Sequence, residues 1–307
     1  MDIINKVETQ VKEAIEKYRL LKKSDKVVVA LSGGKDSTSI IYILKKLGYD
    51  VHGLMIDLYL GSWSDAHKDN MKKFCGEHEI PLMFIDMKKE LGQGICFIKA
   101  VLKEQKNLTG CTVCGIIKRW LLNRWAKKLK ADKLVTGHNL DDEAQNVLMN
   151  FLKGNVLLGI RSSPATGWQV TGDGWQGDGS LAFEAKSSGF VQRVKPFFYV
   201  AENDIREYAK KIGFDILYDK CPCSFETYRS ETRDWLDKIS DDEKLKIVVG
   251  FQKKIPGLRK GDMKELKVCK SCGEPASSEL CNACKIFESL DFKPGKSDEG
   301  CDVSCSV

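Results

Sequence analysis

The residues with the most distinctive chemistry are 31–37, which read Leu-Ser-Gly-Gly-Lys-Asp-Ser and join an apolar run to a helix-like run. A buried strand that turns through glycines into a helix aims backbone N–H groups and the positive end of the helix dipole at one point. Ser32, Lys35 and Ser37 add side-chain donors, and the two glycines let an anion approach the backbone closely. The spacing is neither that of a Walker A loop nor that of the dinucleotide-binding fingerprint. The sequence therefore predicts a phosphate-binding turn of another kind.

Cysteines form the second chemically active set. The chain has 12 of them, and eight fall in close pairs. In a chain that we expect to lie in a reducing compartment, such spacing favours metal ligands over disulfides. The pairs are Cys111/Cys114, Cys221/Cys223, Cys269/Cys272 and Cys281/Cys284.

The last two pairs make one compact C-x₂-C-x₈-C-x₂-C unit. Four thiolates at this spacing satisfy tetrahedral zinc and leave no coordination position open. We therefore expect a structural zinc knuckle held by Cys269, Cys272, Cys281 and Cys284.

Cys111 and Cys114 need partners from elsewhere, because two thiolates cannot close a zinc or an iron–sulfur site alone. Cys221-Pro-Cys223 is the obvious source. Three protein thiolates on a 4Fe-4S cluster would leave one iron open for an exogenous sulfide, which a four-thiolate zinc site would not. Zinc at these cysteines is the alternative.

Acidic residues follow two of the expected strands. Asp57 ends one of them and either contacts a ribose hydroxyl or an adenine edge, or simply begins a loop as a surface acid. The segment 136–145 follows another strand and opens a helix. Asn139 or Asp141 can cap that helix, while an acidic cluster facing a phosphate loop also suits Mg²⁺ or acid–base chemistry.

The net charge of +6 is too small to imply nucleic-acid binding by itself. The locally basic segments 118–130 and 253–260 are either solvated helix faces or contacts for a phosphate backbone. Trp120 and Trp125 lie on the apolar stripe of a helix, so we expect them in the core rather than stacked on bases. Among the unpaired cysteines, we expect Cys75 and Cys96 in the core and assign no role to Cys301 and Cys305.

The elements that position these groups alternate between strand and helix patterns. This alternation predicts an α/β fold, with a parallel sheet covered by helices on both faces, and ligands at the carboxyl ends of the strands. The Gly-rich stretch 167–189 predicts a hairpin or a mobile loop. Strands are expected at 26–31, 51–58, 82–86, 133–137 and 191–194, and helices at 4–22, 36–47, 64–79, 140–151, 201–212 and 240–254.

A length of 307 residues and a composition 42% hydrophobic and 30% charged suit a globular protein with one large domain and a smaller one. No apolar run reaches the roughly 18 residues of a membrane span, and the first residues do not read as a signal peptide. We therefore expect a cytoplasmic protein with no membrane partner. The expected units are an N-terminal helix (1–24), a catalytic domain (25–225), a helical extension (226–266), the zinc knuckle (267–290) and a polar tail (291–307).

Together these motifs resemble the PP-loop ATP pyrophosphatases, and among them the tRNA 2-thiouridine synthetases of the TtuA and NcsA type. The resemblance covers roughly residues 25–290. It rests on Ser-Gly-Gly-Lys-Asp-Ser at 32–37, the C-x-x-C followed by Lys118-Arg119, the segment 137–145, the later Cys-Pro and the C-terminal knuckle. It implies a PP-loop (HUP-like) fold and cleavage of ATP to AMP and pyrophosphate. It also implies adenylation of the C2 oxygen of a tRNA uridine, followed by delivery of sulfur.

The resemblance also implies roles for individual residues. Lys118 and Asp142 would be catalytic, and Cys111, Cys114 and Cys221 would hold the 4Fe-4S cluster. Cys223 is the alternative third ligand, because it takes the place of an aromatic residue that follows Cys-Pro in related sequences. ATP with Mg²⁺ would contact Ala30, Ser32, Gly33, Gly34, Lys35, Asp36, Ser37, Asp57 and Gly137, and RNA would contact Arg119, Arg193 and Lys195.

The implied partners are tRNA, a sulfur donor (free sulfide or a small sulfur-carrier protein) and a second copy of the chain. Such proteins commonly begin with another zinc knuckle, whereas this sequence has no cysteine before Cys75. The stretch 167–189 reads as an insertion. Two rival functions are a PP-loop ligase or sulfurtransferase acting on a non-tRNA acceptor, and a non-catalytic sensor of ATP or of a cluster.

Overall fold

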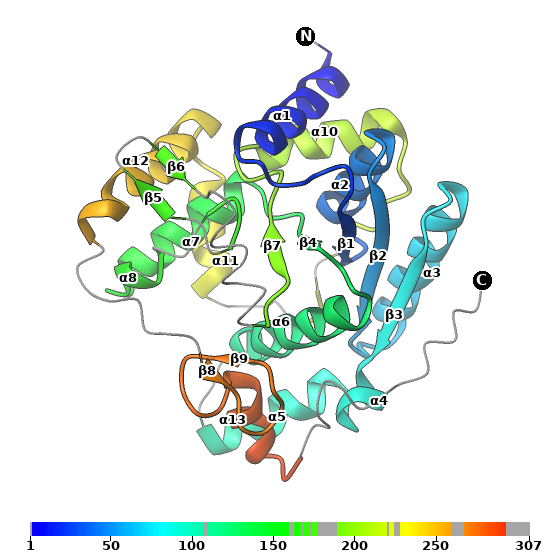
Figure 1. Ribbon diagram of the computed structural model, residues 1–307, viewed down its shortest axis with the longest axis vertical. Coiled ribbons are helices and arrows are strands. Elements are labelled where there is room, and N and C mark those ends of the chain that lie inside the picture. The colour runs from blue at the N-terminus through cyan, green and yellow to red at the C-terminus, as the bar shows by residue number, and fades with distance from the viewer. Residues whose placement is uncertain are drawn as a thin grey trace.

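The computed structural model describes residues 2–106, 110–159, 163–166, 169–171, 174–176, 189–219, 221–223, 228–258 and 267–292. At its centre lies a five-stranded sheet in the order β3-β2-β1-β4-β7 (Figure 1). Every neighbouring pair in this sheet is parallel, which confirms the expected sheet. The strands are β1 (Lys26–Leu31), β2 (Asp50–Asp57), β3 (Leu82–Asp86), β4 (Lys133–Val135) and β7 (Gln192–Val194).

Successive side chains of β1 enter two different cores. Val27 and Val29 pack in one core, and Val28 packs in the other, because neighbouring residues of a strand point to opposite faces. Helices therefore cover both faces of the sheet, as the sequence predicts. One face carries α1 (Ile3–Lys17), α2 (Lys35–Lys46), α3 (Ser62–Glu77) and α10 (Glu202–Ile212), and the other carries α4 (Met87–Leu91), α5 (Ile95–Lys106) and α6 (Gly110–Lys128).

The helices α4 and α5 were not expected from the sequence. The carboxylate of Asp86 caps α4, and Gly92, with a φ of 70°, ends it. Ile95, Ile98 and Leu102 of α5 are buried at helical spacing. Cys96 lies on the other side of α5 and is exposed, so its expected place in the core is wrong, whereas Cys75 is buried as expected.

A third group of helices packs beside β7 around a small core of its own. It consists of α7 (Leu140–Leu152), α8 (Val156–Gly159), α11 (Tyr228–Leu236) and α12 (Asp241–Leu258). Its buried residues are Leu140, Ala144, Phe198, Leu236 and Val248. The helices α11 and α12 fit the expected helical extension as far as it is described.

The Gly-rich stretch contains an antiparallel pair, β5 (Gln169–Thr171) and β6 (Gly174–Gln176), which confirms a hairpin at those residues. The rest of 167–188 lies outside the described residues, as do 259–266, Cys301 and Cys305. None of the described helices is long and apolar enough to cross a membrane. The domain boundaries stay predictions.

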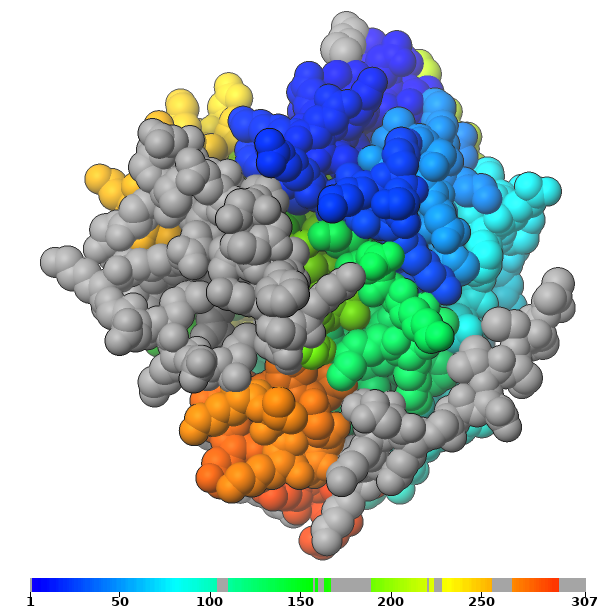
Figure 2. All heavy atoms as spheres, in the orientation of Figure 1, coloured from blue at the N-terminus to red at the C-terminus, as the bar shows by residue number. Residues whose placement is uncertain are grey.

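The C-terminal unit consists of β8 (Lys267–Val268), β9 (Pro275–Ala276) and α13 (Asn282–Glu288). It docks on α6, where the rings of Trp120 and Phe287 meet edge to face at 5.1 Å between centroids. Asn123 and Lys127 of α6 bind the buried carboxylate of Glu274, at 2.5 and 2.9 Å. Trp120 is thus in the core, as expected. Figure 2 shows this unit as a compact orange block at the lower end of the molecule.

Candidate active site

The phosphate-binding turn leaves β1 at the middle of the sheet and enters α2 at Lys35. Gly33 has a φ of 80°, and a Cβ there would collide with Nδ1 of His67, so both conformation and space require glycine. The backbone N–H of Ser32 donates to Oγ of Ser37 over 3.2 Å, which closes the turn. Gly34 caps α2 without a side-chain hydrogen bond, so first-turn N–H groups remain to bind an anion.

The loop after β4 packs directly on this turn. A Cβ on Gly137 would lie 2.9 Å from backbone atoms of Asp36 and Ser37, so the two loops touch. Asn139 caps α7 and forms a capping box with Asp142. The amide of Asn139 also donates to Asp36 over 3.1 Å. Of the two expected caps, Asn139 is the one that the structure shows, and the same residue joins the two loops.

Lys35 is nearly buried, and carboxylates hold its ammonium. Its Nζ lies 2.6 Å from Oε1 of Glu202 and 3.0 Å from Oδ2 of Asp36. Glu202 also forms an ion pair with Arg233 of α11. The loop lysine is therefore already paired before any nucleotide is present.

Asp36 and Asp142 bring two carboxylates together beside the turn. Burial raises the pKa of Asp36, and the charge of Asp142 raises it further, although Lys35 opposes both. Two neighbouring carboxylates beside a phosphate site are the ligands that Mg²⁺ prefers. Their proximity fits the magnesium site expected from the sequence.

Asp142 is surrounded by cations. Its Oδ1 lies 3.3 Å from Nη2 of Arg229 and 3.6 Å from Nη1 of Arg233, both on α11. Burial opposes its ionisation, but His138 and the two arginines outweigh this and lower the pKa of Asp142 below its ordinary value. Sequence reasoning missed Glu202, Arg229 and Arg233, because nothing local marks residues that join the site from distant helices.

The first turn of α6 carries Cys111, which is exposed, and Cys114, which is half-buried. Burial raises the pKa of Cys114, and the neighbouring Cys221 and Cys111 raise it further, against the lowering effect of Lys118 and Lys99. Cys111 and Cys221 are therefore close enough to Cys114 to act on its ionisation, and their role as cluster ligands stays a prediction. Among the described residues, no second group of possible metal ligands lies as close together as the C-terminal four.

Cys223 lies toward α5 instead. Its side chain forms hydrogen bonds with Cys96 and with Lys99. Cys96 and Lys99 are two residues that sequence reasoning missed. Their signal was the spacing of three, which places both on one face of a helix, but that helix had not been recognised.

Two arginines link the cysteines to the nucleotide side. Arg119 of α6 lies close to Cys114, whose charge raises the pKa of the guanidinium against the larger lowering effect of burial. Arg119 also lies close to Arg193 of β7. Burial and then Arg119 lower the pKa of Arg193 to about 10. Among the described residues neither arginine has an ion-pair partner. Arg193 in turn lies near His138, which is beside Asp142.

The remaining predicted residues have local roles in the structure. Lys195 pairs with Glu143 at 2.6 Å and is largely buried. Asp57 accepts the N–H of Tyr59 and pairs with Lys68 at 2.5 Å. Ala30 is half-buried in β1. The assigned roles of all three stay predictions.

Lys118 follows Cys114 by one turn of α6, and within the described chain no hydrogen bond or ion pair joins it to Asp142. The catalytic roles of these two residues also stay predictions.

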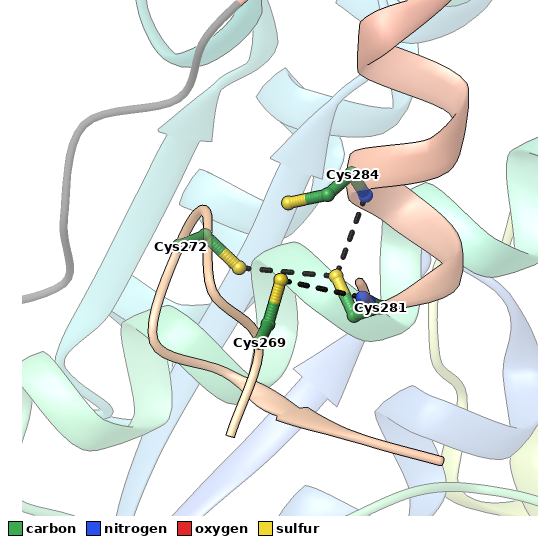
Figure 3. Close-up of side chains that lie close together, drawn as sticks. All are labelled: Cys269, Cys272, Cys281 and Cys284. Carbon is green, nitrogen blue, oxygen red and sulfur yellow. Dashed lines mark hydrogen bonds between the residues drawn. The ribbon is translucent and has the colours of Figure 1, made fainter. Parts of the chain in front are cut away.

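The C-terminal cysteines form a second centre (Figure 3). Their sulfur atoms all lie within 4.8 Å of one another and all four residues are buried. Sγ of Cys272 and Sγ of Cys281 are 3.8 Å apart, and tetrahedral zinc with Zn–S bonds of about 2.3 Å requires a separation of about 3.8 Å. Backbone N–H groups of Cys281 and Cys284 donate to Sγ of Cys269 and Cys281. The arrangement suits a closed four-thiolate metal site.

Comparisons with known proteins extend this picture. The PP-loop domain model matches residues 3–236. The tRNA-5-methyluridine(54) 2-sulfurtransferase of Pyrococcus horikoshii is 32% identical over 302 residues, covering 95% of this chain and 89% of that one. Cytoplasmic tRNA 2-thiolation protein 1 of Caenorhabditis elegans is also 32% identical over 302 residues, covering 95% and 74%. The solved U34-tRNA thiolase NcsA from Methanococcus maripaludis, with its 4Fe-4S cluster, is similar with a TM-score of 0.74 and 27% identity, covering 96% and 90%.

Proposed function

This chain belongs to the PP-loop domain family, and we propose on that premise that it uses ATP to replace the C2 oxygen of a tRNA uridine with sulfur. Two relatives that match 95% of the chain are named for tRNA 2-thiolation or for a tRNA 2-sulfurtransferase. The similar solved structure is a tRNA thiolase. The function is therefore inferred from relatives that match almost the whole chain, which includes both the phosphate-binding turn and the cysteines.

One structural observation carries the proposal: the cysteines and the phosphate turn belong to one continuous charged site. Electrostatic interactions connect the two ends of this site. Cys114 interacts with Arg119, Arg119 with Arg193, and Arg193 with His138. His138 interacts with Asp142, which in turn raises the pKa of Asp36 beside the turn. An enzyme that only adenylates its substrate would have no use for thiols at this place.

The activation step follows from the turn. The N–H groups of residues 32–37 and Lys35 bind the phosphates, and Asp36 and Asp142 are placed to hold Mg²⁺. The uridine C2 oxygen attacks the α-phosphorus, pyrophosphate leaves, and fixed donors offset the charge that develops. Lys118 steadies the adenylated base, and AMP leaves when sulfur attacks carbon 2.

Cys111, Cys114 and Cys221 would hold the 4Fe-4S cluster. When bound by three thiolates, such a cluster supplies one open iron that can hold a sulfide. The contacts favour Cys221 over Cys223 as the third ligand, because Cys221 acts on Cys114 while Cys223 bonds to Cys96 and Lys99. Zinc in the C-terminal four-cysteine site would fix the end of the chain on α6.

The RNA side of the site is assigned to Arg119 and Arg193. Two guanidinium groups close together form an attractive place for a phosphate or for the carbonyl oxygen of a base. Lys195 would contribute through its pairing with Glu143, which holds β7 against α7. We place Asp57 on the ribose side, where it pairs with Lys68.

We further propose that the protein works in the cytoplasm, where the thiolation protein of Caenorhabditis elegans is placed by its name. Its sulfur comes from free sulfide or from a small sulfur-carrier protein. A dimer would suit the size of a tRNA substrate, which can span two copies of the chain.

The decisive experiment supplies the reconstituted protein with ATP, sulfide and unmodified tRNA under anaerobic conditions. We expect AMP, pyrophosphate and 2-thiouridine in equal amounts, and none of them without tRNA. AMP formation with a non-tRNA acceptor would favour the rival ligase or sulfurtransferase. ATP binding without any turnover would favour the sensor.

A further inference from the structure

The cysteine neighbourhood contains more thiols than a three-cysteine cluster needs. Besides Cys111, Cys114 and Cys221 it contains Cys96 and Cys223, whose side chains form a hydrogen bond with each other. Neither of these two surplus cysteines is joined in a disulfide. Any role for this pair in supplying sulfur rests on the proposed function, since that function requires sulfur to reach the site.

The pair is built from two separate elements. Cys96 lies in the first turn of α5, whose opposite side buries Ile95 and Ile98 and fixes the helix against the core. Cys223 comes from the segment 221–223, only two residues after Cys221. Cys96 is exposed and Cys223 is half-buried, so a small donor molecule can reach the Cys96 thiol from solvent.

Lys99 joins this pair to the start of α6. It follows Cys96 by three residues, so both lie on one face of α5, and its side chain bonds to Cys223. A Cβ on Gly110 would collide with Cε of Lys99, so the lysine side chain packs on the first residue of α6, where glycine leaves room for it. Its charge reaches Cys111 and Cys114. The ammonium is therefore a ready counter-charge for any sulfur anion formed between the two sets of cysteines.

We propose that Cys96 and Cys223 form a dithiol that takes sulfane sulfur from a small persulfide and releases it as hydrosulfide beside Cys111, Cys114 and Cys221. The need for two thiols is electronic. Sulfane sulfur must gain two electrons to become hydrosulfide, and a single thiol can only pass the sulfur on unchanged.

The steps balance in atoms and electrons. The Cys96 thiolate attacks the outer sulfur of a persulfide R–S–SH; the S–S bond of the donor breaks, R–S⁻ leaves, and Cys96–S–SH forms. The Cys223 thiolate then attacks the inner sulfur of Cys96–S–SH, so that HS⁻ leaves and a Cys96–Cys223 disulfide remains. The two electrons gained by the sulfur come from the two cysteines. An external dithiol restores the pair by exchange.

The test exchanges the sulfur donor on the cluster-loaded full chain in a single turnover without added thiol. Wild type, Cys96→Ser and a control, Lys103→Ala on the exposed side of the same helix, each receive ATP and tRNA with either sulfide or glutathione persulfide. With sulfide, all three should thiolate tRNA to within about twofold of one another. With the persulfide, Cys96→Ser alone should fall by about tenfold or more.

Peptide mass spectrometry gives a readout that does not depend on tRNA. After treatment with the persulfide, wild type should contain the Cys96–Cys223 disulfide and release about one hydrosulfide per chain. In Cys223→Ser the sulfur should stay on Cys96 as a gain of about 32 Da. The buried Cys75 should remain unmodified in the same digest.

The inference is overturned if Cys96→Ser uses the persulfide as well as wild type does, or if Cys223→Ser retains no sulfur on Cys96. Loss of the cluster absorbance in Cys223→Ser would also overturn it, because Cys223 would then be a cluster ligand. Failure of wild type with sulfide as well as persulfide would instead count against the proposed function, and the mass readout would still test the dithiol.

Discussion

The two cysteine centres of this protein lie along the same helix and differ in almost every physical respect. The C-terminal four are all buried, lie within 4.8 Å of one another and receive backbone N–H groups. The central five come from α5, α6 and the segment 221–223, and none of them is fully buried. A metal that only holds a fold needs the first arrangement, whereas a metal that exchanges sulfur needs access, as in the second.

The groups around the two cysteine centres also differ. The central cysteines are close to Lys99, Lys118 and Arg119. At the C-terminal centre, the indole N–H of Trp120 donates to Sγ of Cys272, and backbone N–H groups donate to Sγ of Cys269 and Cys281. Cations beside accessible thiols suit a site that anionic sulfur enters and leaves, and a closed shell of four thiolates suits a metal ion that stays bound.

The largest expected effect separates the centres by function. Cys111→Ala should abolish tRNA thiolation and the visible absorbance of the cluster, because two thiolates cannot retain it. Zinc content should remain about one per chain. Thiolation assays, absorbance spectra and metal analysis on one preparation check this. Residual thiolation with an intact spectrum would show that Cys111 is no ligand.

Cys272→Ser tests the opposite centre. Loss of one thiolate should release the zinc and lower stability by about 3 kcal/mol, or roughly 10 °C in Tm. Calorimetry and metal analysis measure both. Lys270→Ala, which removes only an exposed ion pair with Glu279, should change Tm by no more than about 2 °C. Equal losses in the two variants would mean that no metal stabilises this unit.

A smaller effect is expected where the two regions meet. Asn123 donates to Glu274 and accepts from the backbone N–H of Val191, so it joins α6 to the knuckle and to the sheet. Asn123→Ala should cost about 2 kcal/mol of unfolding free energy, because buried partners are left unpaired. Asn150→Ala is the matched control, since its side chain bonds to Asn146 within the same helix. Denaturant unfolding that finds the two variants alike would contradict the docking role.

The smallest perturbation is chemical labelling. In zinc-loaded, iron-free protein, iodoacetamide should modify the exposed Cys96 and Cys111 at least about tenfold faster than the four buried cysteines. A strong chelator should remove most of that difference. Peptide mapping over time measures the rates, and fast labelling of Cys269 or Cys284 with zinc present would contradict the closed site.

Local patterns were enough to predict the sheet, the phosphate turn and the knuckle. A strand, two glycines and a helix at 26–46 fix the turn by themselves, and four thiols within sixteen residues fix the knuckle. The structure confirms both arrangements, because short spacing leaves the chain few other ways to bring these groups together.

Contacts between distant segments could not be predicted in the same way. Lys35 and Glu202 are 167 residues apart, and only the packing of α10 beside α2 joins them. The helix α5 was missed because Gly92 and Gly94 interrupt the pattern just before it. Because α5 was not predicted, Cys96 could not be placed on a helix face. The choice between Cys221 and Cys223 as the third cluster ligand therefore had no geometric basis.

The pairing of Lys35 with Glu202 has a consequence for how the phosphate turn chooses its ligand. Because a tethered carboxylate already neutralises the lysine, an incoming nucleotide must exchange with it rather than fill a bare cation. Small monovalent anions in the cell compete poorly against a group that is always at hand, whereas a triphosphate brings several charges at once. Glu202 therefore favours ligands with several negative charges over monovalent ones. The same carboxylate pairs with Arg233, so a nucleotide that displaces Glu202 from Lys35 also changes an ion pair of α11.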